Sequence, residues 1–207
     1  MPTVTVPAPI TTAIAATGVL IRPARRGDSR RIAELVRIAA DGVADYIWST
    51  LAQPGEDLLD VGARRYARDG VAFSHQNAVL AEHDGAVVGL MLAFAMPPRR
   101  EAEAGVEADP ILRPYAELEV PGSLYIADIA VADGYRRHGI ATRLLAVARE
   151  RMRAEALDGM SAIVFAANTA SRRLFQNHGF AVVDRRAVVP HPMIRHTGEA
   201  LLYHAHP

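Results

Sequence analysis

The chain has 207 residues, about half of them hydrophobic, and its 23 basic residues balance 23 acidic ones. This length suits one domain or two small ones, and a net charge of zero provides no overall field to attract nucleic acid or an anionic membrane, so we expect neither as a partner. All 23 basic residues are arginine, and there is no cysteine. The composition therefore excludes a catalytic or phosphate-binding lysine, a cysteine nucleophile, a thiolate zinc site and a disulfide framework.

The chain opens with a stretch rich in Ala, Thr and Pro, residues 1–17, which lacks the basic start of a secretory signal. It predicts a loosely ordered leader before a single domain at residues 18–207. No apolar run approaches the roughly 18 residues that a membrane span needs. A soluble cytoplasmic protein is the default expectation.

The next part of the chain predicts a strand, two helical segments and a hairpin. A short strand at residues 19–24 precedes a helix capped by Asp28 or Ser29, whose apolar residues recur at helical spacing. Gly42 interrupts this helix, and further helix over residues 43–70 is broken at Pro54-Gly55. We expect Trp48 to pack in the core and the "RRYAR" run at residues 64–68 to face solvent. Asp84-Gly85, between two apolar runs, is a strong hairpin signal.

The remaining chain alternates strands and helices after a long connection. The Pro- and Glu-rich residues 97–123 are too long for a tight turn and predict a mobile flap over a site. Strands are expected at residues 124–133, 161–167, 180–186 and 199–206, with helices at Ile140 to about Leu157 and at residues 171–177. The order β-α-α-β-β-β-α-β-α-β-β indicates a mixed α/β fold.

The stretch "GYRRHGIATRLL", residues 134–145, places two arginines, a histidine and a glycine directly before an apolar helix. The first amides of a helix have no partner within it, and the helix dipole adds about half a positive charge there. Phosphate fits such a place. Gly139 allows the backbone to approach a ligand closely, Ala141 keeps the helix start slim, and arginines add charge-assisted hydrogen bonds. An anion site and an arginine-flanked surface turn are both compatible with this stretch.

Arg136-x-x-Gly139-x-Ala141, after a strand that ends in "IAV", resembles the pyrophosphate loop of the GCN5-related N-acetyltransferase (GNAT) family, Q/R-x-x-G-x-G/A. The stretch "NTASRRLFQNHGF", Asn168 to Phe180, is similar to the second signature of that family. The order of elements also matches over roughly residues 19–206. The resemblance implies a GNAT fold, with a central, mostly antiparallel sheet that contains a splayed parallel strand pair and is flanked by helices.

The resemblance further implies acetyl-CoA as co-substrate and no metal. The backbone of Ile129, Ala130 and Val131 would pair with pantetheine, and the amides from Arg137 to Thr142 would hold the pyrophosphate. Asn168 and Ser171 would contact the pantetheine arm or the phosphates, although Asn168 could equally be an ordinary helix cap. The cofactor-binding residues implied in this way are Ile129, Ala130, Val131, Arg136, Arg137, His138, Gly139, Ile140, Ala141, Thr142, Asn168, Ser171 and Phe175.

The reaction implied is direct acetyl transfer to an amine. Phe175 stands where the family often has a tyrosine that protonates the departing thiolate; Ser171, Tyr125, Tyr203 or water could take that role. Asp128 is a candidate general base, with pairing to a neighbouring arginine as its alternative role. Glu119, like Glu117, could attract a cationic amine or simply face solvent.

The leading hypothesis is therefore an N-acetyltransferase that acts on a primary amine of a small molecule or peptide. A non-catalytic acyl-CoA-binding module is the runner-up, because Phe175 lacks a hydroxyl. A nucleotide-binding protein that uses the same loop is a third hypothesis. A homodimer is common in the family, and the apolar leader could contribute to one. The sequence does not select the acceptor amine.

Overall fold

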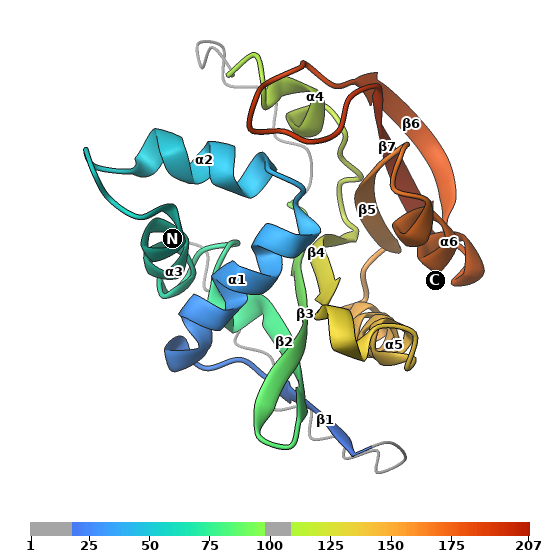
Figure 1. Cartoon of the computed structure of the whole chain (residues 1–207). Coiled ribbons are helices and arrows are strands. Elements are labelled where there is room, and N and C mark those ends of the chain that lie inside the picture. Colours follow the sequence, from blue (N-terminus) through green and yellow to red (C-terminus); the bar gives the residue numbers. More distant parts are fainter. Residues whose placement is uncertain (1–17, 98–108) are drawn as a thin grey trace. The chain divides into compact units, whose positions relative to one another are not determined.

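The structure is a computed structural model that describes residues 18–97 and 109–207 (Figure 1). The strands are β1 (Val19–Pro23), β2 (Ala78–His83), β3 (Ala86–Ala95), β4 (Leu124–Val131), β5 (Met160–Phe165), β6 (Ala181–Ala187) and β7 (Glu199–Ala205). The α-helices are α1 (Ser29–Ala39), α2 (Val43–Leu51), α3 (Leu58–Tyr66), α4 (Arg113–Ala116), α5 (Ile140–Ala154) and α6 (Thr169–Asn177). The 3₁₀ turns are η1 (Arg26–Asp28), η2 (His75–Asn77) and η3 (Asp133–Tyr135).

The strands form a seven-stranded sheet in the order β1-β2-β3-β4-β5-β7-β6. The pairs β1/β2, β2/β3, β5/β7 and β6/β7 are antiparallel, whereas β4 and β5 are parallel. The parallel pairing joins Leu124–Ile126 to Met160–Ala162. This mostly antiparallel sheet with one parallel pair, flanked by helices, confirms the predicted mixed α/β class.

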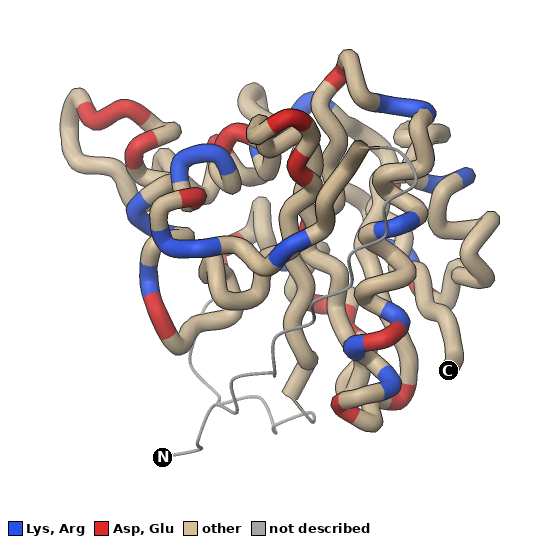
Figure 2. Tube along the Cα trace, turned by 90° about the horizontal axis from the view of Figure 1, so that it is seen from below, with Lys and Arg blue, Asp and Glu red and all other residues tan. Residues whose placement is uncertain are grey.

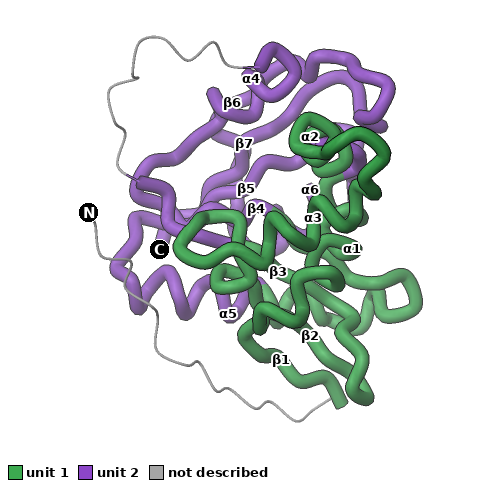
Figure 3. The backbone as a smooth tube through the Cα atoms, turned by 90° about the vertical axis from the view of Figure 1, so that its left-hand side faces the viewer, with its two compact units in different colours: residues 1–40, 44–92, 128–144 green, residues 41–43, 93–127, 145–207 purple. Residues whose placement is uncertain are grey.

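The described residues form two compact units that are not successive stretches of chain (Figure 3). Unit 1 contains residues 18–40, 44–92 and 128–144, and unit 2 contains residues 41–43, 93–97, 109–127 and 145–207. The division into a leader and one domain stays a prediction, and residues 1–17 lie outside the described residues.

Unit 1 is built on the β2–β3 hairpin and on helices whose apolar faces are buried. The hairpin turns at Asp84 and Gly85, which have φ of 49° and 76°, the left-handed values that a tight two-residue hairpin requires. Helix α1 buries Ile32, Leu35 and Val36, as its spacing predicts.

Helices α2 and α3 of unit 1 meet at Trp48, which is 1% exposed. A Cβ at Gly62 of α3 would lie 2.7 Å from the Trp48 ring, so only glycine allows this close approach. The indole also makes an edge contact with Tyr66, with ring centroids 6.4 Å apart. Trp48 is thus a core residue, as predicted.

Unit 2 has a hydrophobic core beneath β5 and β7. Phe165, Ala200 and Leu202 pack there with Leu118 and Ile194, which arrive from irregular segments of the chain. Partly buried Ile111, Tyr115 and Val120, of which Tyr115 belongs to α4, pack against the same core. The long connection is therefore anchored to unit 2 at its described end.

The predicted flap is only partly described, because residues 98–108 lie outside the described residues. Its two ends are joined, since the amide of Met96 donates to the carbonyl of Ser123 at 2.8 Å and the amide of Gly122 donates to that of Met96 at 3.3 Å. The four-residue helix α4 within it was not predicted. Pro114 in its first turn suits a helix start, but four residues produce no periodic signal.

The expected side-chain cap of α1 is wrong in its detail. Asp28 occupies the N-cap position without a capping hydrogen bond. Its carboxylate instead accepts from Arg22, at 2.9 and 3.1 Å, and from the amide of Arg25 at 2.7 Å. The guanidinium of Arg22 is the largest cause of the lowered pKa of Asp28.

Basic and acidic residues are interspersed along the traced chain (Figure 2), in keeping with the balanced composition. No helix among residues 18–97 and 109–207 has both the length and the apolar character that crossing a bilayer requires.

Candidate functional site

The predicted anion loop lies in unit 1, between β4 and α5. β4 ends at Val131, and η3 begins at Asp133 after the single residue Ala132. In the segment after η3, both Arg137, with φ 68°, and Gly139, with φ 74°, have left-handed backbone conformations. A non-glycine residue in this region costs of order 1–3 kcal/mol, and such strain concentrates at functional positions.

The backbone amides of residues 137–142 donate to no acceptor within the described residues. The first amide of this segment that is bonded belongs to Arg143, which donates to the carbonyl of Gly139 at 3.0 Å. Consecutive amides in such turn conformations form an anion-binding concavity, and the start of α5 adds its positive dipole end. The donor set therefore fits a diphosphate.

Side chains around this loop leave its glycine open. A Cβ at Gly139 would have no atom within 4 Å, so space exists for a ligand to approach. Arg137 and His138 are exposed, whereas Ile140 is 2% exposed and anchors the helix start. Arg136 folds back on the strand end, donating to the carbonyl of Val131 at 3.1 Å and pairing with Asp133 at 2.7 Å.

The other residues predicted on this segment line the end of β4 and the first turn of α5. Ile129 and Val131 are half-buried and alternate with buried Ala130, beyond the stretch of β4 that pairs with β5. Ala141 is half-buried and Thr142 is exposed. All belong to unit 1 with the loop.

Asp128 occupies the buried face of β4, with 8% of its surface exposed. The strand alternates buried and half-buried residues, which places Asp128 on the same face as Ile126 and Ala130. Burial raises the pKa of the Asp128 carboxyl to about 7, and the charge of Arg65 opposes this rise. No basic side chain among the described residues lies within ion-pair distance of it, so the alternative role of a paired carboxylate is not observed.

Two residues of α3, Arg65 and Tyr66, interact electrostatically with Asp128. Arg65 is half-buried, with its guanidinium 4.9 Å from the centroid of the Phe73 ring. Tyr66 is 2% exposed, and burial, followed by the charge of Asp128, raises the pKa of its phenol. The expected solvent-facing run at residues 64–68 is thus wrong for Arg65 and Tyr66, because α3 turns one side of this run inward. Helical spacing across Val61, Arg65 and Tyr66 could have indicated this.

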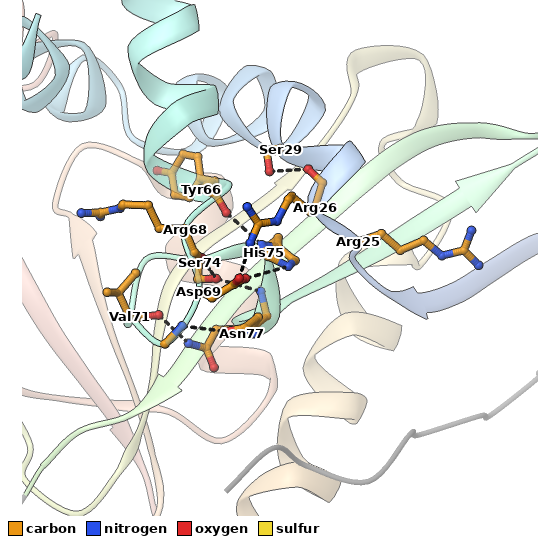
Figure 4. Close-up of polar contacts among 12 residues, drawn as sticks. Arg25, Arg26, Ser29, Tyr66, Arg68, Asp69, Val71, Ser74, His75 and Asn77 are labelled. Carbon is orange, nitrogen blue, oxygen red and sulfur yellow. Dashed lines mark hydrogen bonds and ion pairs between the residues drawn. The ribbon is translucent and has the colours of Figure 1, made fainter. Parts of the chain in front are cut away.

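A polar network holds the chain that follows α3 (Figure 4). Nδ1 of the buried His75 lies 3.1 Å from the carbonyl of Tyr66, and its Nε2 lies 3.7 Å from the carboxylate of Asp69. Asp69 also pairs with Arg26, and the hydroxyl of Ser74 donates to the carbonyl of Arg68 at 2.5 Å. The network holds the end of α3 in place, where Arg65 and Tyr66 interact electrostatically with Asp128.

The second predicted signature lies in unit 2. The side-chain oxygen of Asn168 accepts from the amide of Ser171 at 3.0 Å, so Asn168 caps α6. Ser171 is half-buried. Phe175 is 2% exposed and makes an edge contact with Phe180 at 5.0 Å.

The two acidic residues after α4 differ in their surroundings. Glu117 pairs with Arg113 at 2.8 Å and Arg186 at 2.9 Å, and these arginines lower its pKa. Glu119 is exposed and has no ion pair among the described residues. Within the described chain, no group of three or more His, Asp or Glu side chains is arranged to hold a metal ion.

Comparisons with known proteins bear on this geometry. A family model described as "Acetyltransferase (GNAT) family" matches residues 45–180. The chain is 33% identical over 121 residues to N-alpha-acetyltransferase 40 of Saccharomyces cerevisiae. That alignment covers 55% of this chain and 40% of the yeast protein, less than half of the latter's length.

Solved structures share the fold at low identity. A ribosomal-protein-alanine N-acetyltransferase from Brucella melitensis is 24% identical, with a TM-score of 0.58 over 91% of this chain and 99% of that one. A GNAT family acetyltransferase from Elizabethkingia anophelis with acetyl-CoA bound is 16% identical, with a TM-score of 0.55 over 93% of this chain and 100% of that one. These likenesses show the fold.

Proposed function

Because the chain belongs to the acetyltransferase (GNAT) family, we propose that it is an N-acetyltransferase that uses acetyl-CoA to acetylate a primary amine. The observation that carries the proposal is the run of backbone amides at residues 137–142 with no acceptor among the described residues. Bound acetyl-CoA supplies an activated acetyl thioester. The amides hold its diphosphate, Arg137 adds charge from the exposed side of the loop, and His138 flanks the phosphates.

The remaining contacts to the coenzyme follow from the family resemblance. The backbone of Ile129–Val131 pairs with the pantetheine arm, and Asn168, Ser171 and Phe175 lie along it. Arg136 and Asp133 form an ion pair in which the Arg136 side chain is 54% exposed and the Asp133 side chain is 87% exposed. Such pairs contribute little, so Arg136 can release Asp133 and turn to the phosphates.

Asp128 is the general base in this proposal. A base works best when its pKa lies near the operating pH, and burial brings that of Asp128 to about 7. An α-amine has a pKa near 8, so the transfer of its proton to Asp128 costs little. A lysine-like amine has a pKa near 10.4, and the transfer of its proton to Asp128 would cost about 4–5 kcal/mol. The carboxylate therefore suits an α-amine as acceptor.

We propose the α-amine of a peptide as the acceptor, with a small-molecule amine as the second candidate. The name of the yeast relative, an N-alpha-acetyltransferase, points the same way. Glu119 is exposed and has no ion pair in the described chain, and in this proposal its negative charge attracts the cationic amine. Ser171 remains a candidate for contact with the reacting groups.

The test is release of free CoA thiol when the protein receives acetyl-CoA with a panel of N-terminal peptides, lysine-blocked peptides and small amines. Thiol release that depends on a free α-amine supports the proposal. Acetyl-CoA binding without release from any acceptor favours a non-catalytic acyl-CoA-binding module. Stabilisation by ATP and not by CoA favours a nucleotide-binding protein.

A homodimer and a cytoplasmic location stay predictions from the sequence. Light scattering on the purified full chain, with and without acetyl-CoA, tests the first.

A further inference from the structure

Arg65, on α3 in unit 1, carries a half-buried guanidinium that donates to no acceptor among the described residues. Every other half-buried arginine that the structure describes donates to at least one oxygen: Arg22, Arg31, Arg143, Arg149, Arg151, Arg172 and Arg186. Charged side chains that a protein withdraws from water are normally paired, and burial lowers the pKa of Arg65. This cation therefore indicates a site for an anion that comes from outside the chain.

The ring of Phe73 holds this guanidinium without using its N–H groups. The central carbon of the guanidinium lies 4.9 Å from the ring centroid, and the attraction of a cation to an aromatic face involves no hydrogen bond. Ser74 and His75, which follow Phe73, are tied to the end of α3 through the carbonyls of Arg68 and Tyr66 (Figure 4). The aromatic support is thus anchored to the helix that carries the guanidinium, whose donors are left for a ligand.

Asp128 belongs to the same unit and interacts electrostatically with Arg65. No ion pair joins the two side chains in the described chain, so each keeps its charge for another group. In the proposed function Asp128 receives the amine of the acceptor. The neighbouring positive charge of Arg65 then complements a negative charge that the acceptor carries close to that amine.

On the premise of the proposed function, we propose that Arg65 binds a carboxylate of the acceptor, so that the enzyme prefers α-amines with an acidic group nearby. In a peptide this group is the side chain of an acidic first or second residue, and in a free amino acid it is the α-carboxylate. The planar fork of N–H donors on a guanidinium matches the two oxygens of a carboxylate. Arg65 is a specificity-determining residue in this proposal and takes no part in the making or breaking of bonds.

The test compares Arg65→Met with Arg64→Met. Methionine keeps an unbranched apolar stem and removes the charge. Arg64 precedes Arg65 on α3, is exposed and pairs with Glu56, so its replacement removes the same charge from the same helix but away from the proposed site. Arg65→Lys, which keeps the charge and loses the fork, is the second variant. Thermal unfolding checks that all three variants are folded.

The first readout is the ratio of kcat/KM for amidated tetrapeptides that have Asp or Asn at the first or second residue. The wild type and Arg64→Met should prefer Asp by about 10–100-fold in at least one of the two positions, the factor expected from charge-assisted hydrogen bonds. Arg65→Met should reduce that preference to about one, and Arg65→Lys should keep part of it. Loss of the Arg65 charge also raises the pKa of Asp128, but this effect is common to both peptides and cancels in the ratio.

Free alanine compared with alaninamide provides the matching ratio for an α-carboxylate. If Arg65→Met changes this ratio by about 10–100-fold and leaves the peptide ratios alone, the carboxylate is that of a free amino acid. The opposite result assigns the carboxylate to an acidic side chain of a peptide. Either result supports a carboxylate contact at Arg65.

The second readout needs no turnover. The side-chain Nε–Hε resonance of Arg65 in the CoA-bound, ¹⁵N-labelled protein is identified by its absence in Arg65→Met or Arg65→Lys. The Asp peptide or free alanine should shift this resonance, whereas the Asn peptide and alaninamide should not.

Equal kcat/KM within every pair, a preference for the acidic acceptor that Arg65→Met retains, or an unshifted Arg65 resonance would overturn the proposal. Failure of the proposed function looks different, because the wild type would then release no thiol with any acceptor. Thiol release from acidic and amide acceptors alike would reject the role of Arg65 and leave the proposed function standing.

Discussion

The chain contains two strand–loop–helix connections that use their backbone amides in opposite ways. Between β4 and α5, the amides of residues 137–142 have no acceptor in the described chain. Between β5 and α6, the turn is closed on itself: Asn168 donates its amide to the carbonyl of Phe165 at 2.9 Å and caps the amide of Ser171 with its side chain. A closed turn stabilises its helix, whereas an open one keeps its donors for a ligand.

Asp128, on the strand that leads into the open connection, should show the largest effect. Asp128→Asn keeps the shape of the side chain and removes the base, so kcat should fall by about 10²–10⁴-fold. The wild-type pH profile should show a limb near pH 7, as the carboxyl ionises, and the variant should lack it. Stopped assays of thiol release across pH 5–9 measure both effects, and a limb that persists in Asp128→Asn would reject Asp128 as the base.

The same substitution should change the pH dependence of folding. Because the folded pKa of about 7 lies above the unfolded value near 3.9, the native state binds more protons than the unfolded state between these pH values. Stability should therefore fall as pH rises from about 4 to 7, by about 4 kcal/mol from this residue. Urea unfolding of the wild type against Asp128→Asn measures it; parallel curves over this range would contradict the buried, shifted carboxyl.

Gly139→Val tests the open connection itself. A Cβ at this position would have no protein atom within 4 Å, but the valine side chain should block the approach of the diphosphate. Acetyl-CoA affinity should fall by about 100-fold or more, equivalent to about 3 kcal/mol. Gly70→Val is the matched control, since Gly70 has φ 68° and equally open surroundings in unit 1. It carries the same backbone strain away from the loop. Equal losses of affinity in both variants would show that strain, not the ligand contact, is responsible.

Arg137→Ala should have a moderate effect on binding. One charge-assisted hydrogen bond contributes roughly 1.5–3 kcal/mol, so the Kd for acetyl-CoA should rise by about 10–100-fold at low salt, with a smaller rise at high salt. Removing the side chain leaves the amides in place, so binding should weaken without being abolished. If the wild type and Arg137→Ala bind acetyl-CoA with equal affinity at low salt and again at high salt, Arg137 does not face the anion.

Asn168→Ala should have the smallest effect, and chiefly on stability. Loss of the cap should cost about 1 kcal/mol of folding free energy, while acetyl-CoA affinity changes by less than about threefold. Thermal unfolding and calorimetry measure the two. A large loss of affinity with unchanged stability would reverse the comparison and make Asn168 primarily a ligand contact.

The sequence predicted those features that local chemistry determines. The Asp84-Gly85 turn follows from its left-handed backbone, the α1 face from its apolar spacing, and the loop at residues 134–139 from a glycine between a strand and a helix. The cofactor contacts proposed for Asn168 and Phe175 rest on the family resemblance alone and stay predictions.

Long-range packing could not be predicted in this way. The position of Tyr66 next to Asp128 depends on α3 packing toward β4, and the fit of Trp48 against Gly62 depends on how α2 meets α3. The alternation of β4 did contain a signal that Asp128 is buried, because it shares a face with Ile126 and Ala130.

The most direct measurement is an amide-resolved nuclear magnetic resonance titration of the ¹⁵N-labelled chain with CoA and with its dephosphorylated, diphosphate-free fragment, pantetheine. The account predicts that CoA shifts the amide resonances of residues 137–142 and slows their hydrogen exchange, and that pantetheine does neither. Saturable CoA binding that leaves those amides unshifted and still exchanging freely would contradict it.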